Sequence, residues 1–210
     1  MRVLAARNLL DKKDPTYQFD GVWQDVIGNP EKNGVWIIYG REKNGKTWFA
    51  VMLANYLSQH GRTLYISAEE GLGANFQSTC QRAGVSSTNK KLKFSERIEL
   101  EDLKQKLDAR HVYSFVIIDN ITVYRDDLKR KAIDNLIKSY PKVIFIFLAH
   151  EKNNEPFTAP AQLAKILSKV IIRVEGLACY VSGRCPGGTL MIDEEKAMLY
   201  HGSEIKTKKK

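Results

Sequence analysis

A glycine-framed octapeptide, Gly40-Arg-Glu-Lys-Asn-Gly-Lys-Thr47, follows the apolar run Val35–Tyr39 and opens a segment with helical character, Gly45–His60. A continuous apolar run is typical of a strand that is buried on both faces of a parallel sheet. The octapeptide fits the pattern G-x-x-x-x-G-K-[ST] at every fixed position, in the strand–loop–helix context that gives the pattern its meaning. The sequence therefore predicts a phosphate-binding loop at the carboxyl edge of a mainly parallel sheet.

Each part of this loop has a physical role in holding a polyphosphate. We expect glycine at positions 40 and 45 to permit a tight turn with torsions that a side chain would resist. The loop N–H groups then converge on phosphate oxygens, and the helix dipole adds positive potential there. Lys46 is expected to meet the β- and γ-phosphates, and Thr47 to place its hydroxyl on Mg²⁺. The predicted nucleotide-contacting residues are Gly40, Arg41, Glu42, Lys43, Asn44, Gly45, Lys46, Thr47 and Trp48.

A second apolar run, Ser114–Asp119, ends in a carboxylate. Ligands of open α/β sheets bind at the carboxyl ends of the strands, so we expect Asp119 beside the phosphate loop. An aspartate after an apolar strand is otherwise an ordinary turn residue. Because a phosphate loop lies upstream, the sequence favours a role in holding Mg²⁺ through water, and Thr47 and Asp119 form the predicted metal site.

Strand-like and helix-like segments alternate along most of the chain. Further strands are expected at Thr63–Ser67, Lys91–Phe94 and Lys142–Ala149, and further helices at Ala74–Ala83, Glu99–Arg110, Asp126–Tyr140 and Ala161–Ser168. Near the end, Val170–Val174, Ala178–Ser182, Thr189–Asp193 and Ala197–Tyr200 are predicted as antiparallel strands at the far edge of the sheet. This order predicts an α/β fold, with a mainly parallel central sheet, helices on both faces and a C-terminal antiparallel extension.

The length and composition fit one core with short additions at each end. A chain of 210 residues, of which 43% are hydrophobic, suits a single domain. We expect residues 1–34 to form an N-terminal arm that packs on the core, residues 35–203 to form the nucleotide-binding domain, and residues 204–210 to form a basic, disordered tail. The apolar face of the arm is predicted from the spacing of Phe19, Val22, Trp23, Val26 and Ile27.

The charge balance and the cysteines narrow the classes of partner and compartment. The formal net charge is +9, and subtracting the four lysines within 206–210 leaves +5, which favours a polyanionic partner such as nucleic acid. Three cysteines without a C-x-x-C spacing argue against a disulfide framework or a zinc site. Because no apolar run approaches the ~20 residues of a membrane span and no signal-peptide pattern is present, we expect a cytoplasmic protein without membrane contact.

From the phosphate loop onward, the sequence resembles the RecA/RadA/DnaB superfamily of oligomeric ATPases, which implies a RecA-like P-loop core. The segment Leu64–Glu70, LYISAEE, resembles a core strand that ends in a catalytic glutamate. The resemblance assigns to Glu69 the task of orienting the attacking water, with Glu70 as the alternative. Val143–His150 resembles the strand that carries the switch residue of these ATPases, which implies that His150 senses the γ-phosphate.

A C-terminal segment, Val181–Gly188, resembles the hairpin from which these ATPases reach a neighbouring subunit's nucleotide. The resemblance makes Arg184 the candidate that supplies positive charge in trans. Ser182 and Pro186 replace the lysine and a glycine of the family pattern, so an ordinary hairpin arginine stays open as the alternative. The catalytic residues that follow from the motifs and the resemblance are Lys46, Glu69, Asp119, His150 and Arg184.

In RecA-like oligomers, two loops face DNA: the loop after the strand with the metal-binding acid (the Walker B strand, here ending at Asp119) and the loop after the strand with the switch residue (here His150). In this chain these loops correspond to residues 122–127 and 151–160. An aromatic ring that stacks on bases, next to cations that meet phosphates, holds single strands without sequence preference. Acidic residues in both loops weaken this interpretation, and a phenylalanine between two prolines also suits a plug against the core. The candidate nucleic-acid-binding residues are Arg125, Lys152, Asn153 and Phe157.

Together these features predict an ATPase that uses ATP and Mg²⁺, acts on single-stranded DNA in recombination, repair or replication, and self-associates as a filament or a ring. The compact core resembles recombination ATPases of phages and mobile elements, and archaeal RadB. Two alternatives stay open: a DnaB/RadA-like ring helicase or loader, and a regulatory ATPase that acts on protein and does not bind DNA. No guanine-reading N-K-x-D motif follows the switch strand, which favours ATP over GTP.

Overall fold

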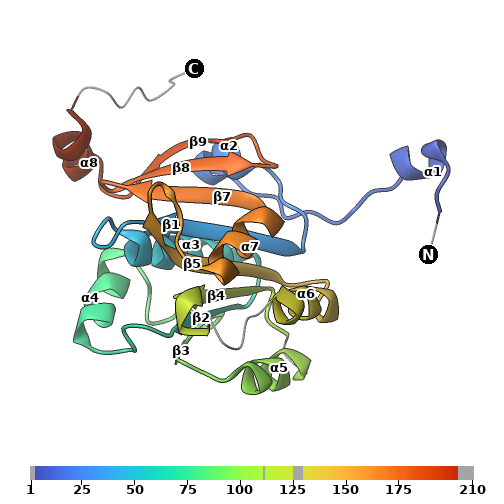
Figure 1. The fold of residues 1–210 in the computed structure, drawn as a ribbon, viewed down its shortest axis with the longest axis horizontal. Coiled ribbons are helices and arrows are strands. Elements are labelled where there is room, and N and C mark those ends of the chain that lie inside the picture. The colour runs from blue at the N-terminus through green and yellow to red at the C-terminus, as the bar shows by residue number, and fades with distance from the viewer. Residues whose placement is uncertain (1–2, 111, 125–129, 203–210) are drawn as a thin grey trace.

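The computed structural model describes residues 3–110, 112–124 and 130–202. Within these residues the chain forms one nine-stranded sheet, with the order β3-β2-β4-β5-β1-β7-β8-β9 and with β6 paired to β5 off this path (Figure 1). The strands are β1 (Gly34–Gly40), β2 (Thr63–Ser67), β3 (Leu92–Glu96), β4 (Phe115–Asp119), β5 (Ile144–Lys152), β6 (Glu155–Pro156), β7 (Ser168–Glu175), β8 (Ala178–Gly183) and β9 (Gly188–Met191).

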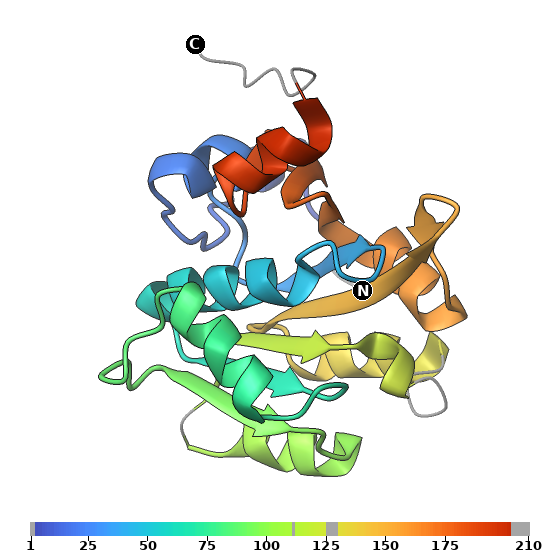
Figure 2. The same ribbon diagram turned by 90° about the vertical axis from the view of Figure 1, so that its left-hand side faces the viewer.

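Helices cover both faces of this sheet (Figure 2). They are α1 (Ala6–Leu10), α2 (Gly21–Ile27), α3 (Lys46–His60), α4 (Ala74–Arg82), α5 (Leu100–Asp108), the 3-10 turn η1 (Ile121–Tyr124), α6 (Arg130–Ser139), α7 (Ala159–Leu167) and α8 (Glu194–His201). Among the described residues, no helix combines the length and the apolar character that crossing a membrane requires.

The six strands from β3 to β7 in this order run parallel, β8 and β9 extend them as antiparallel strands, and β6 pairs antiparallel with the end of β5. The apolar runs of β2 and β4 are buried along their whole length, as expected for strands with helices on both sides. This confirms the predicted fold class. The expectation that Val170–Val174 belongs to the antiparallel extension is wrong, because β7 lies inside the sheet and pairs in parallel with β1.

Successive residues of each central strand feed two separate cores. On β1, Trp36 belongs to the cluster under α2, α3 and α4, whereas Ile37 belongs to the cluster under α5, α6 and α7. This alternation follows from the two-residue period of a strand. Because the central strands are parallel, their carboxyl ends meet at a single edge, and the loops that leave this edge can converge on one site.

The last helix, α8, occupies residues that the sequence analysis assigned to a strand, Ala197–Tyr200, so that prediction is wrong. Asp193 caps the helix: its Oδ1 accepts a hydrogen bond of 3.1 Å from the Lys196 backbone N–H. Glu194 and Glu195 stand in the first turn, where acids favour the helix dipole. The apolar residues of this segment do not form a buried strand, because the side chains of Met198, Leu199 and Tyr200 are exposed.

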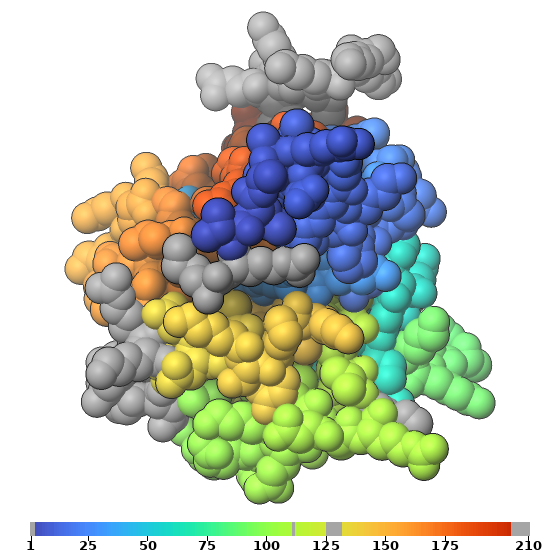
Figure 3. Space-filling model, turned by 90° about the vertical axis from the view of Figure 1, so that its right-hand side faces the viewer, coloured from blue at the N-terminus to red at the C-terminus, as the bar shows by residue number. Residues whose placement is uncertain are grey.

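The N-terminal segment contacts the body through α2 and the residues before it. Phe19, Val26 and Ile27 are buried and Trp23 packs beside them, whereas Val22, expected on the same face, is 59% exposed. Helix α1 buries none of its residues and stands out from the body in Figure 1; seen from that side in Figure 3, it lies above α6 and α5. The predicted tail 204–210 and the first part of the predicted helix at 126–129 lie outside the described residues.

Candidate functional site: a phosphate-binding loop in a polar cavity

The two framing glycines of the loop between β1 and α3 are required for different reasons. Gly45 has φ +94°, and a Cβ there would lie 2.6 Å from Cδ2 of Leu177. Gly40 does not adopt a left-handed conformation; a Cβ there would instead collide with the backbone carbonyl of Val174 on β7. The expected torsional reason therefore holds for Gly45 and is wrong for Gly40, where the close approach of two parallel strands excludes a side chain.

The start of α3 is open to an anion. No side chain caps this helix end, so its first backbone N–H groups are free to meet phosphate oxygens. The Lys46 ammonium donates a hydrogen bond of 2.8 Å to the Arg41 carbonyl across the loop. Burial lowers the pKa of Lys46, and the nearby carboxylates of Asp119 and Glu69 partly offset that shift. The loop thus presents a partly desolvated cation and a set of amides to one point.

Asp119 ends β4 as a buried carboxylate beside this loop. The Tyr65 hydroxyl donates a hydrogen bond of 2.6 Å to its Oδ2, and the Thr47 side chain also hydrogen-bonds it. Burial raises the pKa of Asp119 to about 6, although both hydrogen bonds act in the opposite direction. A carboxylate next to a threonine hydroxyl supplies the oxygen ligands that Mg²⁺ prefers, so the two residues fit the metal that a phosphate loop uses.

Glu69, which follows β2, is held by two side chains from neighbouring strand ends. Asn120 donates a hydrogen bond of 3.1 Å from Nδ2 to Oε2 of Glu69, and Nε2 of His150 lies 3.3 Å from Oε1. His150 itself stands opposite Gly40 in the parallel register of β5 and β1. Both contacts fall on Glu69 rather than on Glu70, although the two acids line the same cavity.

These groups surround a cavity of about 630 Å³. It brings together four of the five predicted catalytic residues, Lys46, Glu69, Asp119 and His150, with Thr47 and Trp48 of the predicted nucleotide-contacting set. Such a volume lies within the range of about 300–1,000 Å³ that small-ligand sites occupy. The chain therefore holds one polar cavity in which a cation, a buried acid and a second acid face the start of α3.

The family profile described as iSTAND, inactive STAND, matches residues 8–157, which is more than half of the chain. The chain belongs to the iSTAND family. No curated protein sequence shows significant similarity to it.

Two solved structures resemble the iSTAND chain in fold. The flagellar accessory protein FlaH from Methanocaldococcus jannaschii is 17% identical with a TM-score of 0.53, over 74% of this chain and 81% of that chain. The ATPase domain of G40P is 13% identical with a TM-score of 0.54, over 79% of this chain and 83% of that chain. The likeness supports the RecA-like P-loop fold.

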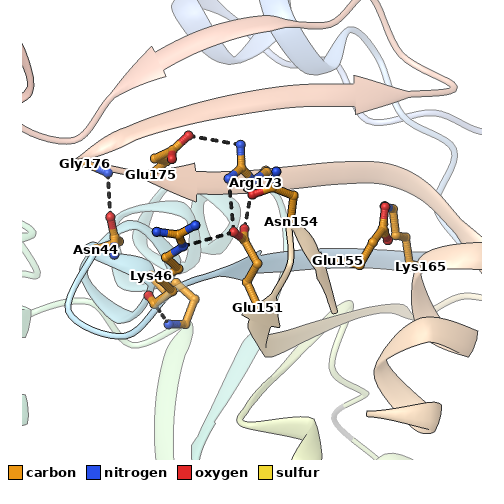
Figure 4. A network of polar contacts seen from close by, with 10 residues as sticks. Asn44, Lys46, Glu151, Asn154, Glu155, Lys165, Arg173, Glu175 and Gly176 are labelled. Atoms are coloured by element: carbon orange, nitrogen blue, oxygen red, sulfur yellow. Dashed lines mark hydrogen bonds and ion pairs between the residues drawn. The ribbon is translucent and has the colours of Figure 1, made fainter. Parts of the chain in front are cut away.

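An ion-pair network that the sequence analysis missed joins the phosphate loop of the iSTAND chain to β5 and β7 (Figure 4). The Glu151 side chain is only 1% exposed and accepts two hydrogen bonds from Arg173, of 2.8 Å and 3.0 Å. Arg41 of the loop lies 3.7 Å from the same carboxylate. The hydrogen bonds to Glu151, and the negative charges of Glu151 and Glu175, raise the pKa of the Arg173 guanidinium above its ordinary value. Glu151 is thus a buried partner of the loop and not a solvated acid of the hairpin.

Asn44 ties the loop of the iSTAND chain to the turn between β7 and β8 (Figure 4). Its Oδ1 accepts a hydrogen bond of 2.7 Å from the Gly176 N–H, and its carbonyl accepts one of 3.3 Å from the Leu177 N–H.

Two further cations reach the cavity: Arg82 at the end of α4 and Lys196 of α8 both lie over the Trp48 ring. No sequence signal marked Arg82 as a site residue, and the assignment of the following residues, Ala197–Tyr200, to a strand hid Lys196.

The structure does not bring Arg184 to this cavity. Gly183 pairs with Val170, which pairs with Trp36 near the start of β1, so Arg184 follows the opposite edge of the sheet. There it lines a second cavity of about 360 Å³ together with Lys169.

Three of the four predicted nucleic-acid contacts lie on or directly after the hairpin of β5 and β6. Phe157 is 57% exposed, so it does not plug the loop onto the core, and the Lys152 ammonium lies 5.1 Å from its ring centroid. Asn153 forms the tip of the hairpin with φ +54°. Arg125 lies outside the described residues.

Proposed function

We propose that this iSTAND chain binds a magnesium-bound nucleoside triphosphate, with ATP as the preferred nucleotide, and hydrolyses it. The observation that carries the proposal is the convergence of Lys46, Thr47, Asp119 and Glu69 on one cavity at the uncapped start of α3. Amides, an ammonium and a hydroxyl next to a carboxylate form the set of groups that a magnesium polyphosphate requires.

Each residue has a distinct task in this proposal. Lys46 exchanges the Arg41 carbonyl for phosphate oxygens, and Thr47 and Asp119 hold Mg²⁺, which neutralises phosphate charge when bound. Glu69 orients the attacking water and accepts its proton. Asn120 keeps the Glu69 carboxylate in place, while His150 is positioned to exchange its Glu69 contact for a γ-phosphate contact. That exchange would report the presence of the terminal phosphate to β5.

Because the family is described as inactive STAND, turnover is the part of the proposal that most needs a test. The loop, the buried acid and Glu69 with its two partners are all present in this chain. These residues support turnover as well as binding. A chain that binds ATP without hydrolysing it would instead be a nucleotide-controlled switch. That outcome favours the alternative of a regulatory protein that acts on a protein partner and not on DNA.

Calorimetric titration with ATP at pH 7.5 and pH 5.5, with and without magnesium, tests this proposal. The pKa of Asp119 is about 6, so its carboxylate is ionised at the higher pH and largely protonated at the lower. We expect the gain in ATP affinity that magnesium provides to shrink roughly fourfold or more at pH 5.5, in line with the ionised fraction. Titrations without magnesium at both pH values correct for protonation of ATP. Absence of ATP binding at pH 7.5 with magnesium contradicts the proposal.

The raised pKa of Asp119 also affects the ligand-free protein, with a defined sign. Because the folded state holds this proton more tightly than the unfolded state, the contribution of Asp119 to the free energy of unfolding falls as the pH rises toward 6. The carboxylate is thus kept in the fold at some cost in stability above pH 6, which suits a group whose charge is needed by a ligand.

We also propose that the chain acts on single-stranded DNA through the β5–β6 hairpin, in recombination, repair or replication. Both acids of this hairpin have a cationic partner within the chain: Glu151 pairs with Arg173, and Oε2 of Glu155 lies 2.6 Å from the Lys165 ammonium. This removes the main objection from the sequence and leaves exposed Phe157 beside Lys152. We propose self-association with it: Arg184 lies at the opposite edge of the sheet from Lys46, so it can act on a nucleotide only in a neighbouring copy.

A fluorescent single-stranded oligonucleotide titrated with the protein in the presence of ATP tests the DNA proposal. We expect Phe157→Ala to weaken binding on the order of tenfold, because stacking of one base on an aromatic ring is worth about 1–3 kcal/mol. Binding should also fall steeply with salt. Leu199→Ala, an exposed apolar residue on α8, serves as the matched control. Equal affinity of the Phe157→Ala variant and the wild type would exclude the hairpin.

A further inference from the structure

The cavity has two chemically different ends. One end carries the acids Glu69, Glu70 and Asp119 with His150, and the proposed function uses all but one of these groups. The other end carries Trp48, Arg82 and Lys196, which come from three different helices, α3, α4 and α8. Two cations and an indole have no task in gripping a magnesium-bound triphosphate tail, which the loop and Asp119 already satisfy.

The three side chains at this second end form one unit. The Arg82 guanidinium carbon lies 4.8 Å from the Trp48 ring centroid, and the Lys196 ammonium lies 5.7 Å from it. Arg82 is anchored by a hydrogen bond of 3.1 Å to the Thr79 hydroxyl, and Lys196 by one of 2.7 Å to Asp193. Both cations are therefore held over an aromatic face, an arrangement that is attractive in itself.

Trp48 also carries an unused hydrogen-bond donor. Its indole N–H is buried and has no acceptor within the part of the chain that the structure describes. Buried donors in native proteins are almost always paired, so an N–H without a partner next to a ligand cavity indicates an acceptor that arrives with a ligand. An oxygen of a ribose or of an inner phosphate is an acceptor of that kind.

The position of Trp48 in the chain fixes which part of a ligand it meets. It follows Thr47 directly in the first turn of α3, where one residue advances the helix by about 1.5 Å. A ligand whose outer phosphates rest on Lys46 and Thr47 therefore has to continue past Trp48. Lys196 is held at that point because α8 is fixed to the loop region: His201 Nε2 lies 2.9 Å from the Glu175 carbonyl, and the Tyr200 ring packs against Gly176.

We propose that Trp48, Arg82 and Lys196 form a subsite for the nucleoside end of the ligand, which rests on the proposed function of the cavity. The two cations leave the ring to meet the inner phosphate and the ribose oxygens, and the base stacks on the indole face that they vacate. An aromatic ring and two cations recognise a base attached to an anion, whereas inorganic polyphosphate offers nothing to the indole. The subsite thus makes the cavity selective for nucleotides over inorganic tripolyphosphate.

Parallel calorimetric titrations with ATP and with inorganic tripolyphosphate, both with magnesium, test this inference. We expect the wild type to bind ATP more tightly. Trp48→Leu should weaken ATP binding about tenfold or more, in line with the loss of one stacked base, and should change tripolyphosphate binding less than twofold. Arg82→Gln and Lys196→Gln should each weaken ATP binding several-fold and tripolyphosphate binding to a smaller extent, because both ligands offer an inner phosphate but only ATP offers ribose oxygens. Trp48→Phe should retain most of the wild-type affinity.

Lys90→Gln removes an equal charge from an exposed lysine outside the cavity and serves as the matched control for both cation variants. Retained tripolyphosphate binding shows in the same titration that each variant is folded. Equal losses for the two ligands, or no loss for ATP, would overturn the subsite. A wild type that binds tripolyphosphate as tightly as ATP would also overturn it while leaving the proposed function intact. A wild type that binds neither ligand would instead overturn the proposed function.

Discussion

Replacing Lys46 with alanine is expected to reduce ATP binding to the limit of detection and to abolish turnover. The ammonium is partly buried next to Asp119 and Glu69, so its loss leaves these carboxylates without a cation where the phosphates must enter. Truncating one member of a desolvated charge pair costs about 2–5 kcal/mol, which corresponds to roughly 30-fold to several thousand-fold in affinity. Calorimetric titration with magnesium ATP measures this loss directly.

Lys90→Ala provides the control for the Lys46 experiment, because it removes an equal charge from an exposed site. The midpoint of thermal unfolding of both variants should stay close to that of the wild type, since Lys46 makes only one hydrogen bond within the described chain. If Lys46→Ala binds ATP with the affinity of the wild type, the loop is not the nucleotide site.

Replacing Glu69 with glutamine is expected to stop hydrolysis while ATP affinity stays within about threefold of the wild type. The amide has nearly the same shape and can still reach Asn120 and His150, but it cannot accept the proton of the attacking water. A positioned general base contributes typically about 10²–10⁴-fold to a rate, and the loss should fall in that range. Release of phosphate under single-turnover conditions measures the effect on the chemical step.

Glu70→Gln is the matched control. This acid lines the same cavity, but the hydrogen bonds from Asn120 and His150 reach Glu69 and not Glu70 among the described residues. We expect a change of less than about threefold in its rate, as for a group that does not take part in the proton transfer. If Glu70→Gln stops turnover and Glu69→Gln does not, the catalytic role passes to Glu70. If the wild type binds ATP without turnover, the assignment of a nucleotide-controlled switch replaces that of an ATPase.

The central part of the fold and the acidic end of the cavity follow from local sequence signals. Apolar runs such as Val35–Tyr39 and Phe115–Asp119 specify buried parallel strands, and the carboxyl ends of such strands must meet at one edge. Asp119, Glu69 and His150 each follow an apolar run, so their convergence on the loop required no knowledge of side-chain packing. The same reasoning located the phosphate loop and the helix that starts from it.

What the sequence did not reveal depends on contacts between distant segments. The sequence suggests that Glu151 is a solvated acid of a polar loop, whereas it belongs to β5 and forms a buried ion pair with Arg173, 22 residues later. Arg82 reaches Trp48 because α4 packs on α3, which no periodicity encodes. Lys196 was missed for a local reason. The apolar residues after it suggested a strand, although Asp193 and the two acids that follow it form a helix start signal. Gly40 was correctly marked, but the carbonyl that excludes a side chain there belongs to β7.

The hydrogen bond between Asn44 and Gly176 has a mechanical consequence for the whole molecule. The phosphate loop cannot change shape around Asn44 without straining the β7–β8 turn, and the Tyr200 ring rests on that turn. The turn that holds the loop is therefore also the support of α8, whose Met198 and Leu199 are exposed. The wall of the cavity and an apolar part of the outer surface thus share one anchor point.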